Sequence, residues 1–103
     1  MAGSTQPFRA SATVTVSVAG AAAGASLPGG GDSLLVFNPN ADIAFIAFGM
    51  GAVTADVTGI PIPPGGTRLL GITPYVNAVS AVISATGDGS GEVYFSRGEG
   101  SVY

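Results

Sequence analysis

The sequence predicts an all-β domain, on three observations. Residues 12–18 alternate strictly, which places three valines on one side and two threonines and a serine on the other, the pattern of a half-buried strand. Short apolar runs recur along the chain, separated by turn-rich segments at intervals of about 8 to 12 residues. Helix signals are weak, since even the alanine-rich stretch 19–27 is broken by Gly20 and Gly24. We therefore expect a single-domain β-sandwich of the jelly-roll type, with about seven or eight short antiparallel strands.

The elements follow from local composition. Residues 27–32 and 38–42 predict turns, since they combine Pro and Gly, or Asn, Pro and Asp. Segment 60–66 predicts an extended edge and turn because its prolines donate no ladder hydrogen bonds. Residues 86–91 predict a glycine-rich hairpin loop between the last two strands. Further strands are expected at residues 33–37, 43–48, 52–57, 67–72, 78–85 and 92–96. The domain then spans residues 11–97, with an N-terminal arm at 1–10 and a C-terminal tail at 98–103.

The run at residues 43–48 is apolar on both faces of the expected strand. Ile43, Phe45 and Ala47 alternate with three further apolar residues. A strand buried on both sides in so small a protein needs its second face covered by another layer or another subunit.

The chain is poor in charge for its size. It has three basic and six acidic residues among 103, a net charge of −3, and a mean hydropathy of +0.53. A folded monomer of this mass exposes on the order of 5,000 Å², roughly one charge per 500 to 600 Å². Soluble domains normally carry more charge than this. We expect homo-oligomerisation, with a trimer preferred over a dimer, or docking on a larger protein lattice. The alternative is a monomer whose outer faces are Ser, Thr, Gly and Ala.

The residue types that are missing exclude many functions. Without His, Cys or Lys, the chain lacks the usual general base, thiolate nucleophile, zinc ligands and P-loop cation. Three arginines give no basic stripe for nucleic acid. The start has no signal-peptide pattern, and no apolar run is long enough to span a membrane. We expect a non-enzymatic, soluble protein made in the cytoplasm, with neither nucleic acid nor membrane as partner.

Three groups of residues resemble functional sites, and each has a simpler structural explanation. Gly29–Gly31 resembles a phosphate-binding loop only superficially, since Asp32 follows and no Lys does. The oxygens of 88–92 could suit calcium, but the spacing differs from the 12-residue calcium loop and a hairpin turn explains it. The six acids show no pairing of the kind glycosidases need. We expect no catalytic residue, cofactor or metal.

Interface residues are expected at the arms, on strand 43–48 and near the last strand. Arg97 could pair with Glu99 or a neighbouring chain's carboxylate, or be solvated. Tyr75, Tyr94 and Tyr103 could form a sugar-binding platform, but the chain has no Trp and few clustered polar partners, and core and interface packing is the favoured explanation. The expected interface residues are Phe8, Arg9, Ile46, Phe48, Tyr75, Arg97 and Tyr103.

Residues 33–100 resemble small virion proteins of tailed bacteriophages, of the capsid cement or decoration type. The resemblance lies in strand and turn patterns at residues 35–39, 44–49, 61–66, 78–85 and 93–100. It implies a β-sandwich or jelly roll on the capsid exterior that bridges neighbouring subunits of the major capsid protein, often as a trimer or dimer. No functional residues carry over, because the pattern consists of scaffold residues. A receptor- or glycan-binding fibre module, a tail or connector component and, least of all, a hydrolase are the alternatives.

Overall fold

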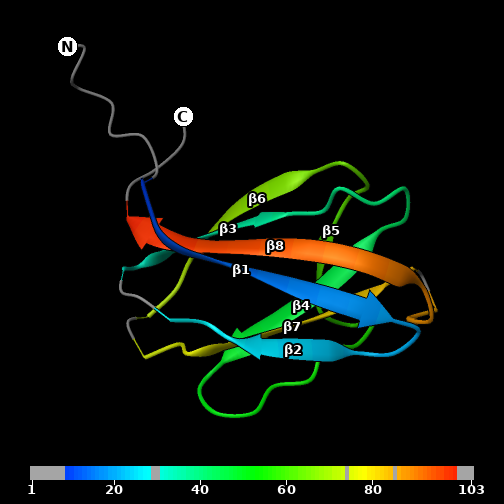
Figure 1. The fold of residues 1–103 in the computed structure, drawn as a ribbon, viewed down its shortest axis with the longest axis horizontal. Coiled ribbons are helices and arrows are strands. Elements are labelled where there is room, and N and C mark those ends of the chain that lie inside the picture. The colour runs from blue at the N-terminus through cyan, green and yellow to red at the C-terminus, as the bar shows by residue number, and fades with distance from the viewer. Residues whose placement is uncertain (1–8, 29–30, 74, 85, 100–103) are drawn as a thin grey trace.

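The computed structural model describes residues 9–28, 31–73, 75–84 and 86–99, and these form an all-β sandwich (Figure 1). One sheet has the strand order β1-β8-β3-β6 and the other β2-β7-β4-β5. The strands are β1 (Arg9–Ala19), β2 (Ala23–Ser26), β3 (Ser33–Phe37), β4 (Ala44–Gly49), β5 (Ile60–Ile62), β6 (Thr67–Gly71), β7 (Ala78–Ile83) and β8 (Ser90–Glu99).

The strand pairing is that of a jelly roll. β1 pairs with β8, β2 with β7, β3 with β6 and β4 with β5, all antiparallel. This is one long hairpin of four strand pairs rolled into two sheets, the arrangement of an eight-stranded jelly roll. The expected fold class is confirmed.

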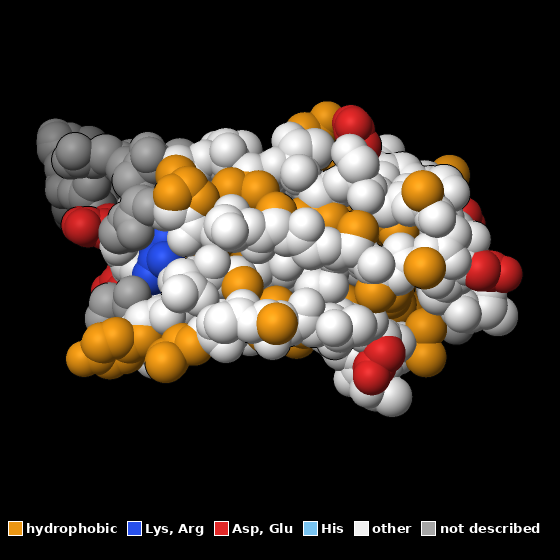
Figure 2. Space-filling model, turned by 60° about the horizontal axis from the view of Figure 1, so that its bottom comes forward, with side chains coloured by type: hydrophobic (Ala, Val, Ile, Leu, Met, Phe, Trp, Pro, Cys, Tyr) orange, Lys and Arg blue, Asp and Glu red, His pale blue; other side chains and the backbone are white. Residues whose placement is uncertain are grey.

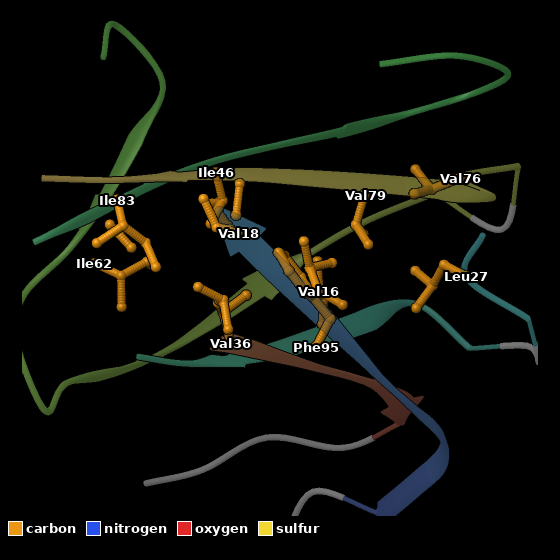
Figure 3. Close-up of a cluster of buried hydrophobic side chains, with 14 of the residues drawn as sticks. Val16, Val18, Leu27, Val36, Ile46, Ile62, Val76, Val79, Ile83 and Phe95 are labelled. Carbon is orange, nitrogen blue, oxygen red and sulfur yellow. The ribbon is translucent and has the colours of Figure 1, made fainter. Parts of the chain in front are cut away.

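The core lies between the two inner faces, where apolar side chains from both sheets meet (Figure 3). Val16 and Val18 of β1 point inward, as their alternation predicts, while Thr15 and Ser17 face out. Phe95 of β8 is fully buried among them. Burying a side chain of this kind stabilises the fold by about 1.5 to 3 kcal/mol. The other core residues are Leu27, Leu34, Val36, Ala44, Ile46, Ile62, Ile72, Val76, Val79, Ala81, Ile83 and Val93.

Two expected elements are wrong, and a third ends earlier than expected. Residues 52–57 form no strand. Residues 86–91 do not close a hairpin, because β7 and β8 belong to different sheets. β7 ends at Ile83, two residues earlier than expected, where Ser84 adopts a positive φ of 79° and Gly87 donates to its carbonyl. The fourth difference is an addition, since β2 forms within the alanine- and glycine-rich stretch.

The 50–59 segment lies on the outer face of the second sheet and replaces the expected strand (Figure 1, green loop below β2). The Ala55 amide donates to Ser80 Oγ at 3.0 Å, and Ser80 Oγ donates to the Ala23 carbonyl at 2.7 Å. Outward-facing Val82 is thereby only 4% exposed. The layer that the doubly apolar strand β4 was expected to need is thus supplied in part by the chain itself.

One end of the sandwich is held together by Asn38, which is fully buried. Its amide nitrogen donates to the carbonyls of Asp42 at 2.9 Å and Ile62 at 3.1 Å. Its amide oxygen accepts from the Asn40 backbone and side chain, and Asn40 in turn donates to the Glu92 carbonyl at 2.8 Å. The side chain therefore joins the β3–β4 and β5–β6 connections and, through Asn40, β8.

We predict that Asn38→Ala lowers the free energy of unfolding by about 2 to 3 kcal/mol, because it leaves several buried groups without partners. For a domain of this size the thermal midpoint falls by roughly 10 °C or more. Calorimetry measures this. Asn77→Ala is the matched control, since Asn77 is exposed and its side chain accepts one described bond, from the Gly51 amide. Equal losses in the two variants would contradict the assignment.

Candidate interaction surface

The outer face of the first sheet carries a continuous apolar patch. Leu35 and Phe37 of β3 point away from the core, because Leu34 and Val36 between them are fully buried. The register places Leu69 of β6 beside Leu35, and Tyr94 of β8 beside Phe37. We call Leu35, Phe37, Leu69 and Tyr94 the Phe37–Tyr94 face.

Aromatic stacking gives this face its shape. The Phe37 and Tyr94 rings are stacked, with centroids 6.1 Å apart and an interplanar angle of 20°. Phe37 remains 39% exposed although it is a large apolar side chain. Such a pair is worth about 0.5 to 1.5 kcal/mol beyond its buried area. The face is therefore a stable platform that still offers apolar surface to a partner.

The polar groups bordering the face are bonded to one another. Tyr94 Oη donates to Glu92 Oε1 at 3.3 Å, and Ser17 Oγ donates to Glu92 Oε2 at 3.5 Å. The Thr13 and Ser96 hydroxyls are 3.0 Å apart. The neutral hydroxyls cost less to desolvate than charges, whereas Glu92 is an exposed carboxylate at the margin of the face.

The sequence indicated only part of this face. The alternation of Val93 and Phe95 around Tyr94 was a usable signal for an outward tyrosine. Leu35 and Phe37 gave none, because residues 33–37 are apolar on both sides. Pairing with β6 and β8 decided which side of β3 is buried.

The expected interface residues divide into several groups. Phe8 and Tyr103 lie outside the described residues, and Arg9 belongs to β1 with its side chain outside the description. Tyr75 is 71% exposed in the β6–β7 connection. Ile46 is fully buried, so it offers no surface to a partner.

On β4 the expected orientation is reversed. Ile46 is a core residue and half-buried Phe48 packs against the core, so these two face inward. Phe45 and Ala47 lie on the opposite, outer side of the strand. Both sides of β4 are apolar, and alternation alone could not say which one meets the other sheet.

Arg97 is buried rather than solvated, with 1% of its surface exposed. Its guanidinium donates to the carbonyls of Gly31 at 3.3 Å, of Thr73 at 3.2 Å and of Val76. These carbonyls belong to the β2–β3 and β6–β7 connections, so Arg97 joins the loops at the end opposite Asn38. Gly31, with φ of +122°, lets the β2–β3 connection lie close against Gly98 of β8, because a Cβ at position 31 would overlap the Gly98 carbonyl. Arg97 is a structural residue of this chain.

Two acids line one shallow hollow, between the 50–59 segment and the β7–β8 connection. Asp56 and Asp88 border it together with Gly20, Val82 and Thr86. Hydrogen bonds from Thr58 lower the pKa of Asp56, and bonds from Thr86 and Ser84 lower that of Asp88. Both carboxylates therefore cap turns, and neither has the raised pKa of a general acid. Within the described ranges no three acidic side chains gather as a metal site would require.

Charge is sparse over the surface as a whole. The chain presents 5216 Å² to solvent, in line with the value expected from its mass. Figure 2, which brings the lower side of Figure 1 forward, shows uncharged side chains across the middle and charged ones toward the margins. Among described side chains Arg68 is the exposed cation, and it donates to the Pro61 carbonyl at 3.4 Å.

No family model, curated protein or solved structure matches this chain. The described part of the chain contains no helix long and apolar enough to cross a membrane.

We predict that Arg97→Lys lowers the free energy of unfolding by about 2 to 3 kcal/mol, because an ammonium group cannot reach three carbonyls with the geometry of a guanidinium. Urea denaturation measures this. Arg68→Lys is the matched control and should cost under about 0.5 kcal/mol, since Arg68 is exposed. A similar cost in both variants would refute the role of Arg97.

The two lowered carboxyl pKa values predict a pH dependence. A carboxyl whose pKa is lowered in the folded state stabilises the protein at pH values above its ordinary pKa of 3.8. This stabilisation is lost as the pH falls through the lowered pKa of the folded state. At pH values below about 4 we expect the midpoint temperature of thermal unfolding to decrease. The decrease should be smaller in the Asp56→Asn/Asp88→Asn variant, which lacks the two carboxylates. Midpoints measured from pH 7 down to about pH 2 test this. Parallel curves for the two proteins would contradict it.

Proposed function

We propose that the chain is a structural adhesion protein that decorates or cements the exterior of a bacteriophage capsid. In this role it bridges neighbouring subunits of the major capsid protein and associates with further copies of itself. The observation that carries the proposal is the Phe37–Tyr94 face, a stacked aromatic and leucine patch on an otherwise charge-poor sandwich.

Adhesion needs area and low desolvation cost rather than reactive groups. An apolar contact of about 1,000 Å² contributes a gross term of order ten kcal/mol, reduced by the costs of ordering and association. The Phe37–Tyr94 face supplies part of such an area, with Phe37 39% exposed and its neighbours half-buried, and the hydroxyls beside it supply hydrogen-bonding groups. Repeated over many copies, modest contacts of this kind would strengthen a shell.

A glycan-binding fibre module is the second candidate. Tyr94 combines a stacked ring with a hydroxyl bonded to Glu92, a pairing of apolar and polar groups that could receive a sugar. Tyr75, by contrast, lies in the β6–β7 connection rather than on this face. A sugar role predicts measurable glycan affinity lost in Tyr94→Ala, which a cement role does not. A tail or connector location would use the same adhesive face on a different lattice.

We predict that Leu35→Thr/Phe37→Thr detaches the chain from its particle. Removing two apolar side chains costs about 2 to 3 kcal/mol per contact, or roughly 30- to 100-fold in affinity. Particles from the native source are separated on density gradients, and the chain is quantified in the fast-sedimenting fractions by mass spectrometry. Electron microscopy of those particles then locates the chain on the shell.

Val53→Thr/Val57→Thr is the matched control. It makes the same type of change in the 50–59 segment, where Val57 is 42% exposed, and should leave attachment intact. Absence of the wild-type chain from fast-sedimenting particles would overturn the proposal. So would equal attachment of the face variant and the control.

A further inference from the structure

We propose that two copies of this chain join through the free edge of β1, by antiparallel pairing of residues 12–18 across a two-fold axis. The inference deepens the proposed adhesive role, on which it rests for its biological use, by naming the surface that holds copies together. Its physical basis is a comparison of the four sheet edges.

Three edges carry features that discourage pairing. β5 has only three residues, one of them Pro61. β6 carries the exposed cation Arg68. β2 has only four residues, and the 50–59 segment lies over its outer face, with the Val53 carbonyl 3.8 Å from the Cβ position of Gly24. Short strands, proline and charge are among the usual protections of a sheet edge.

β1 lacks these protections over most of its length. It is the longest strand, at 11 residues, and within its sheet it pairs only with β8. A register shift between Ala10 and Ala12 interrupts its start, after which residues 12–19 pair regularly with residues 90–97. Those eight residues include no charge and no proline. A long regular edge of this kind is a template for another strand.

The sequence of this edge is self-complementary. A two-fold axis at Thr15 pairs Thr13 with Ser17 and Val14 with Val16 of the second copy. Hydroxyls then meet hydroxyls on the outer face, and valines meet valines on the inner face. A two-fold axis brings like groups together, so a neutral strand can pair with itself without repulsion. The strict alternation thus suits self-pairing as well as half-burial.

Incomplete burial at the same place supports the pairing. Ala12 and Val14 point toward the core side of the sheet but remain half-buried, whereas Val16 and Val18 are at most 3% exposed. A second copy of β1 would cover them and continue the first sheet to eight strands. Its outer side would extend the Thr13, Thr15 and Ser17 hydroxyls in an unbroken row.

The test compares oligomeric state between charge variants. Full-length chain is examined by sedimentation equilibrium from about 1 to 500 µM, and we expect a dimer of twice 10.0 kDa. Thr13→Lys/Thr15→Lys places like charges across the axis on exposed positions, and should weaken association at least about a hundredfold. Thr54→Lys/Thr73→Lys adds the same charge at exposed positions away from β1, and should remain dimeric.

Cross-linking gives a second measurement, which does not require the folded chain to tolerate lysine substitutions in β1. The chain contains no cysteine, so single-cysteine variants are free of background. We expect mild oxidation to link copies through Thr15→Cys, which faces its own counterpart on the axis, since directly opposed strand residues lie within disulfide distance. Thr13→Cys, which faces Ser17 in this register, should not link. Thr54→Cys should not link.

A monomer at all concentrations, a trimer, or a dimer unaffected by Thr13→Lys/Thr15→Lys would overturn the inference. Leu35→Thr/Phe37→Thr separates the two proposals, because it should abolish particle attachment and leave the dimer intact. Loss of attachment with the dimer retained supports both proposals, whereas a wild-type monomer that still attaches overturns only the pairing.

Discussion

The fold depends on satisfying backbone carbonyls where loops cross the ends of the sandwich. Every connection except that between β4 and β5 passes from one sheet to the other. Carbonyls are thereby brought to the ends of an apolar core, where an unpaired group costs about 1 to 3 kcal/mol. Asn38 supplies donors at one end and Arg97 at the other. These two buried side chains provide hydrogen-bond partners for loop carbonyls at the two ends of a small core.

The same scarcity of charge shapes the surface. One of the three arginines is used inside the protein, and acids such as Asp56 and Asp88 accept hydrogen bonds from neighbouring hydroxyls in turns. The outer face of the second sheet is partly covered by the 50–59 segment. The two surfaces proposed above for partners are the Phe37–Tyr94 face and the edge of β1. The apolar face suits a contact with a different protein. The uncharged β1 edge suits pairing with a second copy, because a two-fold axis brings like groups together.

Sequence patterns predicted the strands that alternate between apolar and polar residues or carry a compact apolar run. They did not predict β2, whose formation depends on pairing with another strand. β2 forms from an alanine- and glycine-rich stretch because β7 offers it a ladder, with Ala25 opposite Val79. Residues 52–57 have strand-like composition, yet the Ser80 hydroxyl binds the Ala55 amide and no strand pairs with them. The glycines of residues 86–91 predicted a turn. Whether this turn joins strands of one sheet or of two depends on the partners with which β7 and β8 pair, and these are distant in the sequence.

By itself, the sequence determined the all-β class, the jelly-roll expectation, the inward valines of β1, the edge position of 60–66 and the shortage of charge. These follow from local periodicity, composition and backbone chemistry, which need no knowledge of distant contacts. Tertiary structure decided which side of β3 and β4 is buried, and that Arg97 lies inside. The reason is physical: a strand apolar on both sides fits either way until its neighbours pair, and an arginine is buried only where folded loops present carbonyls to it.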